Sequence, residues 1–435
     1  MKGDFSRSTF NKNNHYNDVL MQQGRFLIDS DWNEEVSIVM HYLQSLARDI
    51  IGPHGGPKGN LGFEIAESKL LPLDFTIGSG HYYVGGILCE LENTVIYSAQ
   101  PDYPLPEEGK RVLHDSNGKY LVYLDVWARH ITYIEDPSLC DVALGGPDTA
   151  TRSKIVSQVK TVKLRQGSAF SSMRPIWVSL LKKWDPKNRC QIKARLRPFV
   201  ESELTDLPLI PPKARYVGLE NHLYRVEVHK PGYAKGNSSD SRLGVSTSGQ
   251  SGRETNSQSE DSLSSRVFKE RATFKWSRDN ASVSFPIRKL THDTVTIDNI
   301  WREDRFSLKE GDWVEAVDDD YALQNSASDL FRIERIDLGN NEVKLNGDLN
   351  LSEYWEAKHP LLRRWDQKGD RNGIPIIEGT LNKFWFDLEA NIQIQFQPGG
   401  TYRTGDYWLI PARAVTGDVE WPCQAGNPPH NHLMV

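Results

Sequence analysis

The sequence lacks the features that mark several large classes of protein. The 435-residue chain has four cysteines, Cys89, Cys140, Cys190 and Cys423, far apart and with no C-x-x-C pair. This spacing argues against a zinc ribbon and against a disulfide-rich scaffold. There is no run of about 18 apolar residues and no apolar core of a signal peptide near residue 1, so we expect neither a transmembrane helix nor a signal peptide. We therefore expect synthesis in the cytoplasm.

An excess of positive charge is also missing. The chain has 52 Lys and Arg against 58 Asp and Glu, a net charge of −6, and no block of basic residues. Nucleic acids and anionic membranes are therefore not expected as partners. In contrast, 12 Trp, 16 Tyr and 15 Phe are present, which indicates a folded, aromatic-rich protein.

The usual catalytic and metal-binding patterns are absent as well. No G-x-S-x-G string marks a serine hydrolase. We interpret Asp318, Asp319 and Asp320 as a solvated turn rather than as the carboxylate pair of a glycosidase. His430-x-His432, near Cys423, follows a Gly/Pro-rich segment and is interpreted as a loose tail rather than a metal site. We expect no enzyme activity, no catalytic residue, no metal and no cofactor.

One helix is predicted clearly. Asp31 and Glu34 resemble a capping box, which predicts a helix that begins near residue 31 or 32 and ends before Gly52-Pro53. Its apolar side chains recur at intervals of three and four and form one stripe: Trp32, Val36, Val39, Leu43, Leu46 and Ile50. A stripe this narrow is typical of helix-on-helix packing. It either covers its own domain or serves as an assembly face.

The remainder predicts a mainly β protein, with several small antiparallel sandwich or barrel-like modules and one N-terminal α-helix. The expected division is an N-terminal arm, short strand and helix (1–52), a β-rich domain (53–232), a Ser-rich insertion (233–268), a small barrel-like module (269–350) and a C-terminal β module (351–435). Clusters of β-branched and aromatic residues predict strands at 75–77, 82–84, 87–89, 94–97, 120–126, 155–164, 223–229, 272–276, 295–297, 313–317, 331–336, 343–345 and 407–410. Further candidates lie around 175–178 and 190–196, and 351–358 is a candidate short helix.

Two segments have distinctive patterns. Between Asn237 and Arg266 there are eleven serines and no aromatic residue, which predicts a mobile loop that is dispensable for folding and interrupts one hairpin. In residues 391–397 polar and apolar residues alternate strictly, which predicts a strand with one buried face and one wet face.

The N-terminal arm is polar apart from Phe5, Phe10 and Tyr16. An arm this thin cannot bury three aromatic rings by itself, so we expect a neighbouring subunit to supply the missing surface. The alternative is that the arm folds back on its own β-domain. The candidate interface residues are thus Phe5, Phe10, Tyr16, Trp32, Val36, Val39, Leu43 and Leu46.

Several strings resemble an uncharacterised-domain family found in gene clusters of phage-tail-like contractile injection systems. They are 1–7 (MKGDFSR), 21–25 (MQQGR), 29–34 (DSDWNE), 123–127 (YLDVW), 143–152 (ALGGPDTATR), 218–227 (GLENHLYRVE), 273–280 (TFKWSRDN) and 404–413 (TGDYWLIPAR). The resemblance implies a non-enzymatic structural part of such a particle, in or on its baseplate, present in several symmetric copies and in contact with other subunits. The alternatives are a glycan- or surface-binding module and an enzyme that acts on cell wall.

Overall fold

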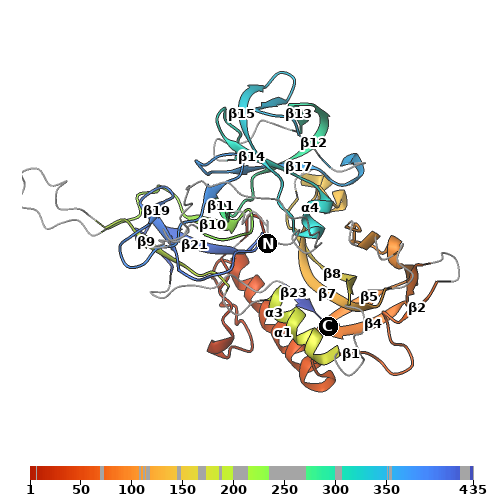
Figure 1. The fold of residues 1–435 in the computed structure, drawn as a ribbon. Coiled ribbons are helices and arrows are strands. Elements are labelled where there is room, and N and C mark those ends of the chain that lie inside the picture. Colours follow the sequence, from red (N-terminus) through yellow and green to blue (C-terminus); the bar gives the residue numbers. More distant parts are fainter. Residues whose placement is uncertain are drawn as a thin grey trace, which may run out of the picture.

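The computed structural model describes residues 1–5, 7–68, 73–106, 109–110, 113, 118–144, 148–164, 173–185, 189–198, 214–234, 271–298, 306–349, 351, 355–421 and 432–434. It is mainly β, with several small antiparallel sheets, a closed barrel and few helices (Figure 1). Nearly all of the expected insertion 233–268, together with Cys423 and His430, lies outside the described residues. None of the described helices combines the length and the apolar character needed to cross a membrane.

The predicted N-terminal helix is confirmed as α1 (Asp29–Ile51). It begins two residues earlier than expected, and the capping box is wrong: Ile28 occupies the N-cap position and makes no side-chain cap. Asp29 and Asp31 instead lie in the first turn, where their charges favour the positive end of the helix dipole. At the other end Gly52 adopts a φ of 96° and its N–H donates to the Arg48 carbonyl.

The region after α1 contains three small sheets. One joins β1 (His54–Gly55), β4 (Gly80–Val84) and β5 (Ile87–Leu91), and a second joins β2 (Ile65–Glu67), β3 (Phe75–Ile77) and β6 (Val95–Ile96). The third is a long hairpin of β7 (Tyr120–Ile131) and β8 (Arg152–Lys163), with β23 (His432–Met434) on the other side of β7. The strands predicted in this region are confirmed.

The strand expected around 175–178 is wrong, because these residues belong to the helix α3 (Met173–Trp184). Trp177 and Trp184 are seven residues apart and therefore share one helix face. Their rings lie 6.0 and 4.6 Å from the ring of Tyr123 on β7. The packing of Trp177 and Trp184 from one helix face thus outweighs the preference of the individual residues for strands.

A β-sandwich follows. Its five-stranded sheet has the order β18 (Ile374–Pro375), β11 (Thr273–Ser277), β10 (His222–Val228), β21 (Tyr407–Arg413), β22 (Asp418–Val419). The facing sheet has the order β19 (Phe386–Asp387), β20 (Ile392–Phe396), β9 (Ile192–Leu196). The hairpin predicted across the Ser-rich insertion is confirmed, since β10 pairs with β11 and places Val226 opposite Trp276.

The barrel closes in the order β12 (Ser284–Thr291), β13 (Thr294–Ile297), β16 (Glu342–Leu345), β15 (Leu330–Asp337), β14 (Trp313–Val317), β17 (Leu361–Trp365). The strand pairing therefore crosses the expected boundary at 350: β17 completes the barrel, while β11 belongs to the five-stranded sheet. Of the candidate helix at 351–358, residues 352–354 lie outside the described residues, and Trp355–Ala357 form a 3-10 turn.

Two expectations about polar residues are corrected. The strand predicted at 391–397 exists as β20, but both of its faces are buried. On the polar face Gln395 donates to the carbonyls of Leu381 and Lys383. The acidic triplet is not a solvated turn. Asp318 is buried and caps the short helix α4 (Asp319–Gln324), its side chain accepting from the Tyr321 N–H.

Candidate functional site

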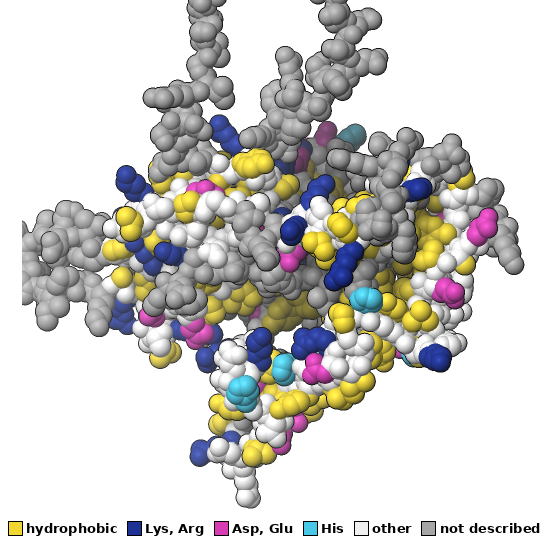
Figure 2. Space-filling model, turned by 60° about the horizontal axis from the view of Figure 1, so that its bottom comes forward, with side chains coloured by type: hydrophobic (Ala, Val, Ile, Leu, Met, Phe, Trp, Pro, Cys, Tyr) yellow, Lys and Arg dark blue, Asp and Glu magenta, His cyan; other side chains and the backbone are white. Residues whose placement is uncertain are grey.

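The helix α1 turns its apolar side outward. The α1 stripe consists of Trp32, Val36, Val39, Leu43, Leu46 and Ile50. Its side chains are between 49% and 75% exposed. Figure 2 brings the bottom of the molecule forward, where α1 lies in Figure 1, and shows hydrophobic side chains gathered on that face. The stripe is therefore exposed in the isolated chain, although Leu43, Leu46 and Ile50 face the β4–β5 hairpin and β8 across a groove.

The helix α1 contacts the rest of the chain beside the stripe as well as opposite it. Beside the stripe, Gly86 of the β4–β5 turn lies against the Gln44 carbonyl, and Gly55 lies against Ile51. Ile38, only 1% exposed, and Ser30 are its buried residues. At 100° per residue they lie on the side away from the α1 stripe. Leaving a large apolar side chain in water forgoes roughly 1.5–3 kcal/mol relative to burying it. Six exposed large apolar side chains on one helix are typical of a surface that contacts a partner.

Phe5 and Phe10 each contact another part of the chain, as in the alternative in which the arm folds back on its own chain. The Phe5 ring lies 4.8 Å from the ring of His130 at the end of β7, edge to face. The Phe10 ring lies 5.6 Å from that of His41 on α1. Phe10 is half-buried, whereas Phe5 is 37% and Tyr16 58% exposed, so both Phe5 and Tyr16 remain accessible to a partner.

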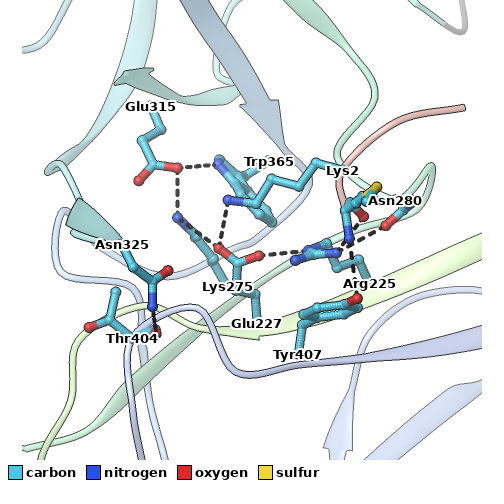
Figure 3. Close-up of polar contacts among 11 residues, drawn as sticks. Lys2, Arg225, Glu227, Lys275, Asn280, Glu315, Asn325, Trp365, Thr404 and Tyr407 are labelled. Atoms are coloured by element: carbon cyan, nitrogen blue, oxygen red, sulfur yellow. Dashed lines mark hydrogen bonds and ion pairs between the residues drawn. The ribbon is translucent and has the colours of Figure 1, made fainter. Parts of the chain in front are cut away.

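A buried charge layer fills the space between the five-stranded sheet and the outer wall of the barrel (Figure 3). We define it as Lys2, Arg225, Glu227, Lys275, Glu315 and Trp365. Arg225 and Glu227 lie on β10 and Lys275 on β11, and each alternates with core residues of the sandwich. Glu315 on β14 and Trp365 on β17 project from the barrel.

Every charge in this layer has a partner of opposite sign. The Arg225 Nε lies 2.6 Å from Glu227 Oε2, and the Lys275 Nζ lies 2.6 Å from Glu315 Oε2. The other carboxylate oxygen of Glu227 is 2.9 Å from Lys2 Nζ and 3.6 Å from Lys275 Nζ. The indole N–H of Trp365 donates to Glu315 at 2.9 Å. The layer therefore joins the sandwich, the barrel and residue 2.

The first three residues are held at the edge of this layer. The Gly3 N–H donates to the carbonyl of Asn280, and the Asn280 side-chain amide donates back to the Gly3 carbonyl. Arg225 donates to the Met1 carbonyl at 3.1 Å. The Met1 amino group donates to the Tyr407 hydroxyl at 3.2 Å, and the Tyr407 ring stacks under Arg225.

Electrostatics keep the carboxylates of the layer ionised. Burial by itself raises the pKa of Glu227, but Lys2, Arg225 and Lys275 outweigh it and hold that pKa well below its usual range. Glu315 shows the same balance, with Lys275 as the main cause of its lowered pKa. Burial lowers the pKa of Lys2 to about 8. A dry site packed with opposite charges thus fixes one geometry and leaves its acids deprotonated.

A cavity of about 430 Å³ adjoins the layer. Its wall carries both signs of charge, and many of these charges are already paired, such as Arg129 with Asp319 and Glu135. No group of three or more His, Cys, Asp or Glu residues among those described could hold a metal ion. The arrangement suits the joining of modules better than the binding of one class of ligand.

The charge layer was missed in the sequence because its residues follow an ordinary strand pattern. In 222–228 the charges at 225 and 227 alternate with Tyr224, Val226 and Val228, which normally indicates a solvent-facing side. The balance of charge could have revealed the layer. The paired strands 222–228 and 273–277 carry one acid, Glu227, and two bases, Arg225 and Lys275, so a second acid is needed. Glu315 in the strand 313–317 is such an acid.

The family described as "Family of unknown function (DUF6519)" matches residues 1–206 and 188–431. The chain belongs to this family. Neither the curated proteins nor the solved structures contain a match to the chain. Four of the strings that resemble the contractile-injection family contribute residues to the charge layer or its edge. These residues are Lys2, Arg225, Glu227, Lys275, Asn280 and Tyr407.

Proposed function

We propose that the chain is a non-enzymatic structural component of a phage-tail-like contractile injection particle, associated with its baseplate and held there through the α1 stripe. The observation that carries the proposal is the orientation of α1, which buries Ser30 and Ile38 and presents six large apolar side chains to solvent. A surface of this kind is stabilised when a neighbouring subunit covers it.

The charge layer supports a structural role in a second way. Four of the strings that carry the resemblance, 1–7, 218–227, 273–280 and 404–413, build this joint between modules. Their charged groups pair with one another rather than converging on a free nucleophile or an open coordination site. These four strings therefore build a joint between modules, and a subunit of a symmetric assembly has to hold such a joint rigidly.

The glycan-binding alternative is less well supported by the described surface, because its exposed tyrosines are scattered: Tyr16 lies on the arm, Tyr42 on α1 and Tyr233 beside Arg271, just before β11. Sugar rings stack on exposed aromatic side chains, commonly on the face of a sheet. Among the described tryptophans Trp32 is the exposed one, and it lies on α1 within the stripe.

Imaging of particles assembled with and without this chain tests the proposal. We expect a defined density for the chain at the baseplate end and its disappearance when the chain is omitted. A glycan array and a cell-wall turbidity assay on the purified chain should both be silent. Intact particles with no position for the chain, or a positive result in either assay, would contradict the proposal.

A further inference from the structure

A second apolar surface lies just before α1. We define the N-terminal loop as residues 11–28. Within it Leu20 is 81%, Phe26 97%, Leu27 79% and Ile28 51% exposed. In the described structure the backbone N–H groups of Phe26 and Leu27 have no hydrogen-bond partner. The loop thus offers both apolar side chains and free backbone donors to solvent.

A groove of about 980 Å³ lies at the other end of the same helix. We call it the α1 groove; it runs between the C-terminal half of α1, the hairpin β4–β5 and the strand β8. Its apolar lining includes Leu43 and Ile50 from the α1 stripe, with Ile87, Leu91 and Ile155 opposite them. Within the described sheets β5 and β8 each pair on one side only, so open strand edges border the groove.

The charges of the loop and the groove are complementary. The groove rim carries Glu90, Glu92 and Asp102. Asp102 is paired with Lys154, and Glu90 lies 3.3 Å from the His81 ring, which leaves Glu92 as the carboxylate without an ion pair among the described residues. In the loop Arg25 directly precedes the most exposed side chain, Phe26. A loop that enters with Phe26 and Leu27 would bring Arg25 to this acidic rim.

The loop does not fill the groove of its own chain. Just before the loop, Phe10 contacts His41 and the Thr9 hydroxyl donates to Glu34. Both partners lie on the buried side of α1, away from the stripe and the groove. None of residues 11–28 lines the groove.

We infer that the N-terminal loop of one copy of this chain occupies the α1 groove of a second copy. This inference rests on the proposed function and names one of its contacts. Because loop and groove are different surfaces, the contact is heterologous and repeats head to tail, which closes into a ring or continues as a filament. An extended loop segment beside an open strand edge is also the arrangement used in β-strand addition.

Sedimentation velocity of the purified full-length chain over a concentration series tests the inference. Wild-type protein should associate with increasing concentration. Phe26→Asp should weaken this association about tenfold or more, because it places a charge where an apolar anchor is buried. Val415→Asp is the matched control: Val415 is 91% exposed in a turn far along the chain, and its replacement should leave association unchanged.

Charge exchange makes the test specific for loop and groove. Arg25→Glu and Glu92→Arg should each weaken self-association, and mixing the two variants should restore it, since each loop then meets a groove of opposite charge. A wild-type chain that stays monomeric throughout, or a mixture that associates no better than either variant, would overturn the inference. If the wild type is monomeric but Phe26→Asp abolishes incorporation into particles, the loop binds another subunit; this inference then fails while the proposed function stands.

Discussion

The helix α1 and the charge layer reverse the usual distribution of residues in opposite ways. On α1 six large apolar side chains face water, whereas in the charge layer Arg225, Glu227, Lys275 and Glu315 are each no more than 3% exposed. The two regions differ in whether the chain itself supplies the contacts. The buried charges form ion pairs within the chain, whereas the side chains of the α1 stripe remain exposed in the described structure.

The two regions also differ in what their contacts provide. Buried ion pairs add little net stability, because desolvation offsets most of the attraction, but they tolerate few alternative geometries. The charge layer therefore sets how the barrel sits on the five-stranded sheet. An apolar stripe allows more geometries of contact, and it contributes to the free energy of association mainly through the burial of its side chains. One region fixes the shape of the subunit and the other is available to attach it.

Removing one charge from the layer should have the largest effect on folding. Glu227→Ala removes this counter-charge from Arg225 and Lys275, which are buried, and from Lys2, which is partly buried. We expect a loss of about 3–5 kcal/mol in the free energy of unfolding, measured by urea denaturation.

The matched control breaks a surface pair. Arg288 and Asp298 form an ion pair in which both side chains are exposed. Asp298→Ala should cost about 0.2–1 kcal/mol. Equal losses for Glu227→Ala and Asp298→Ala would remove the distinction between a joint and an ordinary surface contact.

Lowering the pH should destabilise the protein through His229, which lies beside the charge layer. His229 is fully buried beside it, neither ring nitrogen has a hydrogen-bond partner among the described residues, and burial lowers its pKa to about 3. Below pH 6.5 the unfolded chain binds a proton that the folded chain does not, so stability falls as the pH drops towards 3.

The expected loss from this histidine is about 2 kcal/mol between pH 6.5 and pH 5. Unfolding measurements at the two pH values should show a smaller loss in His229→Leu. His81→Gln, at an exposed histidine, should behave like the wild type. A His229→Leu variant with the full wild-type loss would show that other groups control this range.

Shortening the Ser-rich insertion should have a small effect. The strands on either side of it pair directly, with Val228 opposite Phe274, and the Ala272 N–H donates to the Tyr233 carbonyl. Replacing residues 237–266 by a short Gly/Ser turn should change the free energy of unfolding by about 1 kcal/mol or less, because loop closure depends weakly on length. Phe274→Ala, at a fully buried position, is the positive control with an expected loss of about 3–5 kcal/mol. Loss of soluble expression in the shortened protein would contradict the prediction.

The sequence predicted local elements better than their assembly. Strands such as 75–77 and 313–317 were predictable because β-branched and aromatic residues cluster between turn residues. The helix 173–184 was missed because its aromatic residues also favour strands. The barrel boundary was missed because β17 joins the barrel through pairing with β12 and β14, which no local pattern records.

The same limit applies to the candidate site. The periodicity of α1 identified the stripe, but not which side of the helix would be covered. Phe5 and Phe10 were predictable as anchors, yet their partners His130 and His41 lie far away in the chain. The charge layer is formed by ion pairs between strands that are far apart in the sequence. No local pattern around Arg225 or Glu315 predicts that the two residues lie in the same layer.

The most direct test of the account is the occupancy in sedimented particles of a chain with Trp32→Ser, Leu43→Ser and Ile50→Ser. The three positions are 69%, 54% and 75% exposed, so the purified variant should unfold at the wild-type temperature and yet be lost from particles. The control chain carries Leu219→Ser, Leu381→Ser and Val415→Ser, which are also exposed, and should be retained. A folded stripe variant that co-sediments at full occupancy would contradict the claim that α1 attaches this subunit.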